Sequence, residues 1–581
     1  MQPSSDTDSS SVCLDNSSAP TSFESAWVMP PMSDDITPFN SPRIMANLSL
    51  NGDDKEVDDF KLVTDEDRAE ALRIKGEANK AFAAKDFKKA IQLYGDAITL
   101  NPKDPIFWSN RAFAKMKLEE FGGAVSDATK AIEIDPKAVK AYYRRALSQL
   151  AVLHPKPAVA DLKEVLKLEP SNIEARKQLE ATQKLMHRIA FEKAISAGDT
   201  ESASHRSRRM INDGSCPMDA KYTGPLPQPP SESEGENGRW KPTKEFVEGM
   251  IEWFREGKGH LPKRLVWEIV LGCEEVLRKE KTLVEIDIEE DCTVDVIGDT
   301  HGQFYDLLHL FTLTGPPSPN HILLFNGDFV DRGSWSVEVA LTLFAYKWLY
   351  PNRIYLNRGN HETADMNKVY GFEGEVKHKH GEPTYKLFSD VFTALPLATL
   401  LSPTRSPRTL SSLSLSRDPP KAFLSPEGRK RFFVVHGGLF SKDGVTLDDI
   451  RKIDRFGRQP GQEGLMMELL WTDPQEAEGR GPSKRGVGVG FGPDVTKTWC
   501  EANGVTAVFR SHEVRQAGYS VEHDGLCVTV FSAPNYCDST GNKGAFIRVD
   551  AEGEVKYTSF NSVSHPPMRP MAYSQGFNGL M

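Results

Sequence analysis

Six short apolar runs in the second half of the chain each end abruptly on polar residues of one chemical kind. Each run has the length and the β-branched or aromatic content of a buried strand, and polar residues follow at once, with glycine among them in four of the six segments. The polar segments are 298–302 (GDTHG), 327–333 (GDFVDRG), 358–362 (RGNHE), 436–438 (HGG), 510–513 (RSHE) and 532–536 (SAPNY). Layered α/β proteins place ligands at the carboxyl ends of strands, so the series predicts a site built where these strands end.

The side chains in these segments form a donor set that suits two metal ions. The two-residue step in Asp299-x-His301 puts a carboxylate and an imidazole on the same side of an extended segment. Three His, two Asp and one Asn, arriving from separate strands, favour Mn, Fe, Zn or Mg over copper or an iron–sulfur cluster. A carboxylate such as Asp328 can bridge two ions about 3.5–4 Å apart, which is the arrangement used for in-line displacement at phosphorus.

The same motifs resemble those of a known family. The order GDxHG, GDxVDRG, GNHE resembles the fingerprint of the calcineurin-like metallophosphoesterases. The segments VVHGGLF, LLWTDPQ, SKRG, RSHEV and FSAPNYC are similar to the phosphoprotein phosphatase branch of that group. The resemblance implies a β-sandwich flanked by helices, two divalent metal ions, and hydrolysis of phosphoserine and phosphothreonine in phosphoprotein substrates. Manganese is the ion expected to support activity in vitro.

The resemblance also assigns roles to individual residues. The implied ligands of the first metal are Asp299, His301 and Asp328, and those of the second are Asp328, Asn360, His436 and His512. The implied nucleophile is a hydroxide held by both metals. His361 is the implied general acid, with Asp331 orienting its ring, while Arg332, Arg485 and Tyr536 hold the phosphoryl oxygens.

The first half of the chain carries a repeat of 34 residues. Pro102, Pro136 and Pro170 are spaced by this period, and each closes an amphipathic helical segment. A 34-residue period of helix pairs is typical of tetratricopeptide repeats, and three units are the minimum expected to be stable. We therefore predict an all-α tetratricopeptide superhelix over 65–195, with a capping helix after the third repeat.

Equivalent positions of such repeats line one row of the superhelix, and one row here is Gly76, Asn110 and Arg144. A set of cationic and amide side chains around that row resembles the carboxylate clamp of tetratricopeptide co-chaperones: Lys75, Asn79, Asn110, Lys140 and Arg144. The resemblance implies binding of the acidic C-terminal EEVD tail of heat-shock protein 90, with heat-shock protein 70 as the other candidate. Two terminal carboxylates need cations and amide donors, which this set supplies.

The remaining segments complete the predicted organisation. Residues 1–60 form an acidic tail that we predict to be disordered, 196–240 a linker, 241–560 the phosphatase domain, and 561–581 a regulatory tail. The Ser/Pro/Arg-rich stretch 402–420 reads as an insertion, and 201–209 as a smaller one. A linker of about 45 residues gives the repeat domain a high effective concentration at the active-site face, so we expect it to restrain basal activity.

The composition argues against a membrane-spanning, a disulfide-rich or a nucleic-acid-binding protein. No apolar run approaches the roughly 18 residues of a membrane span, and seven scattered cysteines favour reduced thiols. The net charge of −11 is concentrated in residues 1–60, so it gives no sign of a nucleic-acid partner. We expect a monomer in the cytoplasm, with the nucleus as a second compartment. Two alternatives remain: an inactive scaffold, which predicts a lost ligand, and a nuclease or nucleotidase, which SAPNYC and SKRG disfavour.

Overall fold

The computed structural model describes residues 63–196, 201–229, 240–404, 423–461 and 463–574. The acidic tail predicted at 1–60 lies outside these residues, as does most of the predicted insertion at 402–420. The described part of that stretch belongs to a strand rather than to an insertion, because Ser402 and Pro403 pair with Asp287 and Ile288.

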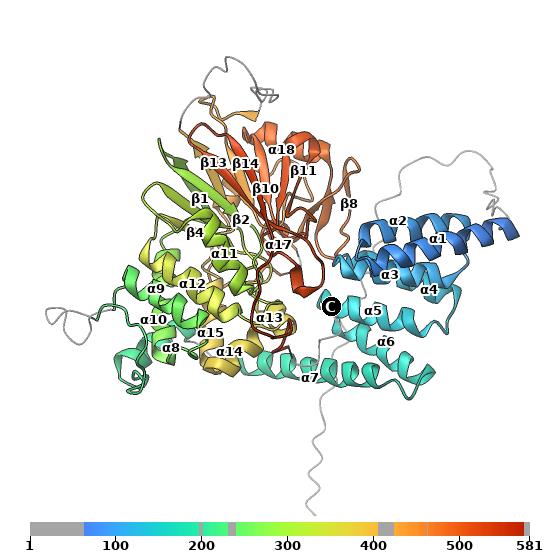
Figure 1. The fold of residues 1–581 in the computed structure, drawn as a ribbon, viewed down its shortest axis with the longest axis horizontal. Helices are drawn as coiled ribbons and strands as arrows, with labels where there is room; N and C mark the ends of the chain where they lie inside the picture. Colours follow the sequence, from blue (N-terminus) through green and yellow to red (C-terminus); the bar gives the residue numbers. More distant parts are fainter. Residues whose placement is uncertain (1–62, 197–200, 230–239, 405–422, 462, 575–581) are drawn as a thin grey trace, which may run out of the picture. The chain divides into compact units, whose positions relative to one another are not determined.

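The predicted repeat domain consists of three antiparallel helix pairs and one longer helix (Figure 1). Its helices are α1 (Asp65–Ala83), α2 (Phe87–Leu100), α3 (Pro105–Lys117), α4 (Phe121–Ile134), α5 (Val139–Ala151), α6 (Pro155–Leu168) and α7 (Ile173–Ser196). The second helix of each pair ends two residues before one of the spaced prolines, because proline cannot continue a helix. Fully buried alanines, among them Ala90, Ala112 and Ala128, let the helices pack closely. The predicted superhelical repeat and its capping helix are therefore present.

Each helix pair turns through a residue with left-handed backbone. Lys85, Glu119 and Leu153 stand 34 residues apart and have φ of 63°, 59° and 60°. Because L-residues rarely adopt positive φ, this recurrence marks the same tight turn in every repeat. The side chain at this position is therefore displayed at the tip of a turn, and in the second repeat it is a glutamate.

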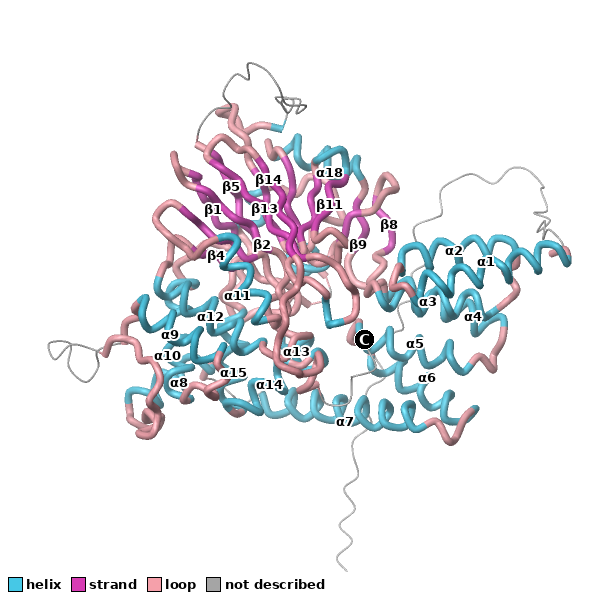
Figure 2. Tube along the Cα trace, viewed as in Figure 1, coloured by secondary structure: helices cyan, strands magenta, loops and turns pink. Residues whose placement is uncertain are grey.

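The second domain contains three sheets (Figure 2). The six-stranded sheet has the order β1 (Leu283–Ile288), β5 (Ala398–Pro403), β6 (Phe432–Val435), β10 (Ala507–Arg510), β12 (Cys527–Val530), β11 (Tyr519–Glu522). The five-stranded sheet has the order β14 (Val555–Phe560), β13 (Gly544–Asp550), β2 (Thr293–Ile297), β3 (His321–Phe325), β4 (Ile354–Leu356). A small third sheet is formed by β7 (Asp473–Pro474), β9 (Val489–Phe491) and β8 (Arg480–Pro482).

The two large sheets pack face to face, and helices cover their outer faces. Along β3, Ile322 and Leu324 join the core between the sheets, whereas Leu323 and Phe325 join the core beneath the helices. This alternation explains why the strand sequence HILLF is apolar throughout, since both of its faces are buried. The predicted β-sandwich flanked by helices is confirmed.

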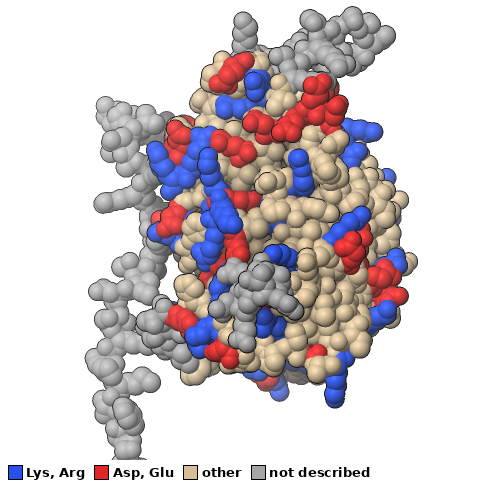
Figure 3. Space-filling view, turned by 90° about the vertical axis from the view of Figure 1, so that its left-hand side faces the viewer, with Lys and Arg blue, Asp and Glu red and all other residues tan. Residues whose placement is uncertain are grey.

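The helices of this domain lie between the strands in sequence. They are α9 (Lys244–Arg255), α10 (Lys263–Leu277), α11 (Phe304–Thr314), α12 (Ser336–Leu349), α13 (Ala364–Tyr370), α14 (Phe372–His380), α15 (Glu382–Phe392), α16 (Leu447–Arg451), α17 (Leu465–Trp471) and α18 (Pro493–Asn503), with 3-10 turns η3 (His523–Gly525) and η4 (Tyr536–Asp538). Among the described residues, no helix has both the length and the apolar character that crossing a membrane requires. Basic and acidic side chains are interspersed on the face drawn in Figure 3.

The predicted linker 196–240 differs from expectation, because it contains helix α8 (Ala203–Asn212). Ser202 caps this helix, and the Ser204 N–H donates to Asp390 at 3.0 Å. Arg208 pairs with Glu274 at 2.9 Å, which attaches α8 to α10. Most of the run 201–209, interpreted from the sequence as a small insertion, lies in this helix. Its fully buried residues, Ser204 and Ser207, are not detected by hydropathy patterns, and only the half-buried Met210 and Ile211 add apolar contacts.

Candidate active site

The carboxyl ends of parallel strands from both large sheets meet at one edge of the sandwich. Strands β2, β3 and β4 are parallel neighbours in one sheet, and β6, β10 and β12 are parallel neighbours in the other. The six polar segments predicted from the sequence follow these six strands. Asn326, directly after β3, links the two sheets by donating to Val435 O at 2.8 Å and to Ser511 Oγ at 2.9 Å. The polar segments are thereby brought to one place.

Many residues at this edge have strained backbones. His301, Asp328, Asp331, Arg332 and His512 have φ between 40° and 69°. Left-handed backbone at a non-glycine residue persists only where the surrounding structure holds it, and such residues cluster at functional sites. Glycines permit the close approaches, since a Cβ on Gly359 would lie 2.1 Å from the Asp328 carboxylate.

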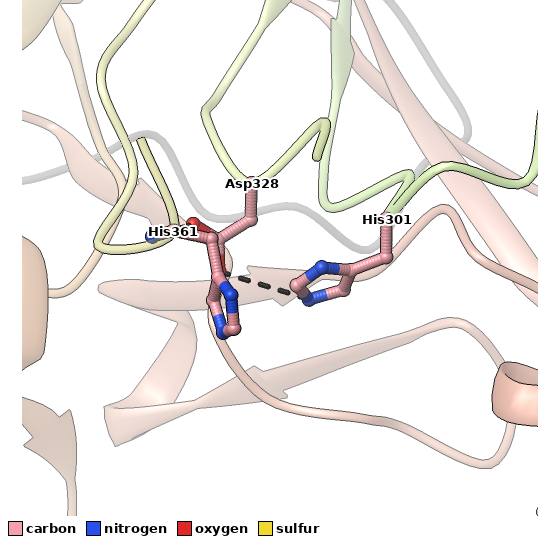
Figure 4. Close-up of side chains that lie close together, drawn as sticks. All are labelled: His301, Asp328 and His361. Carbon is pink, nitrogen blue, oxygen red and sulfur yellow. Dashed lines mark hydrogen bonds and ion pairs between the residues drawn. The ribbon is translucent and has the colours of Figure 1, made fainter. Parts of the chain in front are cut away.

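The first group of candidate ligands contains His301, Asp328 and His361 (Figure 4). The His301 ring places Nδ1 3.0 Å from Val330 O, so Nδ1 donates and Nε2 carries a lone pair. That Nε2 lies 3.7 Å from Asp328 Oδ2 and 3.8 Å from Asp299 Oδ2. Asp299 is thus next to this group, as the sequence predicts for the first metal. His361 is an additional member whose predicted role is that of an acid.

The second group contains Asp328, His436 and His512, so Asp328 belongs to both. His436 donates through Nδ1 to Asn326 O at 2.9 Å, which leaves a lone pair on Nε2. This nitrogen faces Asn360 Oδ1 at 2.9 Å, Asp328 Oδ2 at 3.2 Å and His512 Nδ1 at 3.2 Å. Lone pairs directed at one another repel unless a cation lies among them. His512 Nε2 is also buried without a hydrogen-bond partner among the described residues.

Burial disfavours the charged forms of the titratable side chains at this site. It raises the pKa of Asp299 to about 8, and it raises the pKa of Asp328 well above its usual range. Burial also lowers the pKa of His301, His436 and His512, so these rings are neutral and able to act as ligands. Buried carboxylates beside neutral imidazoles lack compensating charge, which divalent cations would supply.

His361 is held by two further side chains. Its Nδ1 lies 2.9 Å from Asp331 Oδ2, and its backbone N–H donates to Asp328 Oδ1 at 2.8 Å. Asn367 donates to the same Asp331 oxygen at 3.0 Å. Burial and the positive charge of Arg332 lower the pKa of His361. The ring is therefore fixed with Nε2 as the nitrogen available to the site.

The three predicted phosphate-binding side chains are all buried and contact one carboxylate, that of Glu119 in the turn between α3 and α4. They are Arg332, Arg485 and Tyr536. Glu119 Oε1 lies 2.7 Å from Arg332 Nη2 and accepts from the Tyr536 hydroxyl at 3.3 Å. Its Oε2 lies 3.9 Å from Arg485 Nη1. An anionic group is thus already present where a phosphoryl group is predicted to bind.

Sequence reasoning missed several residues that support the site. Glu362 accepts three backbone N–H groups, from Asp328, Phe329 and Gly359, at 2.8–3.0 Å. Asp473 accepts from Arg485 Nε at 2.7 Å. Glu362 and Asp473 both lie inside quoted motifs, GNHE and WTDP, where a charged residue without a role could have been flagged. Glu119 carries no such signal, because a glutamate in a surface turn is ordinary.

The predicted clamp residues of the repeat domain lie on the first helices of the three pairs. Lys75 and Asn79 lie on α1, Asn110 on α3, and Lys140 and Arg144 on α5. Arg144 Nη1 donates to Ser109 O at 2.7 Å and to Asn110 Oδ1 at 3.2 Å. Asn79 accepts from Tyr94, and Lys140 is exposed.

Comparison with known proteins first defines the class. Residues 292–516 match the family of calcineurin-like phosphoesterases, and residues 179–285 match the PPP5 TPR repeat region. A solved protein serine/threonine phosphatase from Saccharomyces cerevisiae matches with a TM-score of 0.50 and 43% identity, covering 57% of this chain and 100% of its own. The second domain is therefore a calcineurin-like phosphoesterase domain.

Curated relatives define the family more narrowly. Serine/threonine-protein phosphatase T of Aspergillus oryzae is 50% identical over 89% of this chain and 99% of its own length. The phosphatase T of Schizosaccharomyces pombe is 53% identical over 87% and 98%, and human serine/threonine-protein phosphatase 5 is 45% identical over 87% and 93%. The chain belongs to the serine/threonine-protein phosphatase 5/T family. It is a protein serine/threonine phosphatase with a tetratricopeptide-repeat region.

Proposed function

We propose that this phosphatase works with two divalent cations at the strand ends, and that its repeat domain restrains it until a partner binds. The facing donor atoms of His436, Asn360 and Asp328, with His512 Nδ1 beside them, fit a bound cation. Two cations held here would activate a water molecule and neutralise the phosphoryl oxygens. Asp299, His301 and Asp328 would hold one of them, and Asp328, Asn360, His436 and His512 the other, with manganese, iron, zinc and magnesium all compatible with these donors.

The remaining side chains would act on the phosphorylated substrate itself. Arg332 and Arg485 offer guanidinium donors to the phosphoryl oxygens, and the Tyr536 hydroxyl offers a third. Arg332 Nε is buried without a partner among the described residues, so it still has a donor for a ligand. The Asp331 contact fixes the ring of His361 with Nε2 directed into the site. In its protonated, imidazolium form His361 would donate through Nδ1 to Asp331 and give its Nε2 proton to the leaving serine or threonine oxygen.

The observation that carries the proposed restraint is the position of Glu119. Its carboxylate makes the contacts with Arg332, Arg485 and Tyr536 that a phosphoryl group would make. A carboxylate and a phosphoryl group compete for the same donors, so the repeat domain blocks the site while Glu119 is bound. Tethering within one chain makes even a modest contact effective.

A close backbone contact between the start of α4 and the loop 484–486, called the seam below, lies beside Glu119 and supports the same interpretation. Gly123, at the start of α4, donates its N–H to Lys484 O at 3.0 Å. A Cβ on Gly122 would lie 2.4 Å from Gly486 N and 3.0 Å from Arg485 C, both backbone atoms. Only glycine fits at 122 while the seam is closed. The loop that carries Arg485 is therefore in direct contact with the repeat domain.

Gly122→Ala should release the restraint. The new methyl group collides with backbone, which cannot move aside as a side chain would, so the closed arrangement is disfavoured. We expect basal turnover of p-nitrophenyl phosphate to rise on the order of tenfold, within the range usual for coupled sites. Steady-state assays at saturating Mn²⁺ measure this, and an EEVD-ended peptide should add little to the variant's rate.

Gly123→Ala is the matched control for this experiment. The atoms nearest to its Cβ would belong to the flexible end of Lys115, at 3.2 Å and beyond, and its N–H is retained. Both substitutions place alanine in α4, where it is a better helix former than glycine, so the repeats should stay folded. If Gly122→Ala and the wild type had equal basal rates, the proposed restraint would be wrong.

The proposed partner site is the clamp of Lys75, Asn79, Asn110, Lys140 and Arg144. The five residues lie on α1, α3 and α5, and the match to co-chaperone clamps favours the EEVD tail of heat-shock protein 90 over other acidic peptides. Helix α3 carries Asn110 and leads directly into Glu119, so peptide binding and release of the phosphate site share one helix. A peptide would activate the enzyme only if it bound the open form more tightly.

Arg144→Ala should weaken binding of an EEVD-ended peptide by roughly 2–5 kcal/mol, because a desolvated carboxylate would lose its charged partner. Isothermal titration calorimetry on the full-length protein measures the change. Arg176→Ala is the control, since Arg176 is exposed on α7 and donates to Pro170 O. Unchanged affinity in Arg144→Ala would exclude the clamp, whereas equal losses in both variants would indicate a nonspecific charge effect.

A further inference from the structure

The chain after β14 returns to the active site and contacts two of its loops. We define residues 563–574 as the tail strap. The first loop, 327–336, follows β3 and carries Arg332. The second loop, 532–540, follows β12 and carries Tyr536. Both side chains are among those proposed to hold the phosphoryl group.

The strap makes three hydrogen bonds with the Arg332 loop. The Met571 N–H donates to Arg332 O at 2.7 Å. The Ser334 hydroxyl donates to Arg569 O at 2.8 Å and accepts from the Ala572 N–H at 3.2 Å. Ser334 is 2% exposed and Met571 1%, so water does not replace these contacts. Two consecutive residues of this loop, Asp331 and Arg332, have positive φ and need such support.

A second contact joins the strap to the Tyr536 loop. His565 Nε2 lies 3.1 Å from Asp538 Oδ1, and its ring packs edge-on against Trp335 at 5.1 Å between centroids. Its Nδ1 lies 2.8 Å from Pro566 O, so both nitrogens face acceptors. Partial burial lowers the pKa of His565, but the Pro566 carbonyl and Asp538 outweigh this and raise it. Cys537 and Asp538 in this loop also have positive φ.

We propose that the tail strap positions the phosphate-binding side chains, with Ser334 and His565 as positioning residues. By joining the two loops, the strap fixes the separation of Arg332 and Tyr536 before substrate arrives. Preorganised donors bind a phosphoryl group without the cost of ordering two strained loops. This inference rests on the proposed phosphate-binding role of Arg332. It goes beyond the expected regulatory role of 561–581, because a strap that only restrained the enzyme would not support substrate binding.

The test uses the full-length chain with Glu119→Gln, which removes the competing carboxylate. In this background, Ser334→Ala should raise both the KM for p-nitrophenyl phosphate and the Ki for inorganic phosphate by about 2- to 10-fold, the effect of one or two hydrogen bonds. The kcat should change less than twofold. Ser334→Thr keeps the hydroxyl and should restore both constants towards those of the background.

Ser574→Ala is the matched control, because Ser574 belongs to the same strap and its Oγ has no hydrogen-bond partner among the described residues. His565→Ala tests the other loop at a partly exposed residue, and it serves if Ser334→Ala does not fold. The proposal is overturned if the Ki is unchanged in these variants while Arg332→Ala raises it. A higher kcat with an unchanged KM would instead make the strap only a restraint. An unchanged Ki in Arg332→Ala would refute the phosphate assignment itself.

Discussion

Asp328→Asn should leave a folded protein that releases no measurable phosphate from a phosphoserine peptide at any Mn²⁺ concentration. Asp328 is the residue shared by both candidate metal groups, with Oδ2 3.2 Å from His436 Nε2 and 3.7 Å from His301 Nε2. Asparagine keeps the shape but removes the charge and replaces one oxygen with an amide donor. Two cations sharing this position would then repel each other without compensation.

Metal analysis of the purified protein is the second readout for this variant. We expect the wild type to retain close to two divalent ions per chain after dialysis and Asp328→Asn to retain fewer. Asp494→Asn is the control, because this substitution makes the same chemical change outside the site. Asp494 is an exposed residue in the first turn of α18. Two ions retained together with normal turnover in Asp328→Asn would refute the shared-ligand assignment.

The candidate ligands could be located from the sequence because their signal is local. Each candidate ligand lies close to the end of a strand whose apolar run is visible, and glycine marks most of the turns. Asp299, His301 and Asp328 therefore stand out without knowledge of the strand order. The repeat can also be recognised from local sequence, because the second helix of each pair ends two residues before one of the three equally spaced prolines. Parallel pairing of β2 with β3 and of β6 with β10 then brings separate segments together.

Contacts between distant segments could not be predicted in this way. Glu119 reaches Arg332 because three repeats stack in register and place a turn residue at the phosphatase domain, and no local pattern encodes that distance. Ser334 looks like an ordinary serine after GDFVDRG, although it joins the tail to the loop. Helix α8 is hard to predict for a related reason, because its fully buried residues are serines and it is also attached by the ion pair of Arg208 with Glu274.

His361→Asn separates two roles that its position allows. His361 lies among the candidate ligands with His301 and Asp328, yet its hydrogen bond to Asp331 is the arrangement of a proton donor. If it is the acid, the variant should keep its metal ions and lose on the order of 10²–10⁴ in turnover of a phosphoserine peptide. If it is a ligand, metal content should fall with activity. Elemental analysis and steady-state kinetics on the same samples distinguish the two roles.

The choice of leaving group sharpens this prediction. A serine alkoxide must be protonated as it departs, whereas p-nitrophenolate is weakly basic and departs with little help. Loss of the acid should therefore cost much more with the phosphoserine peptide than with p-nitrophenyl phosphate. Asp331→Asn, which leaves the ring without its carboxylate partner, should show the same substrate dependence at smaller size. His205→Asn, at an exposed position on α8, is the control. Equal losses on both substrates, with metal retained, would rule out His361 as the proton donor.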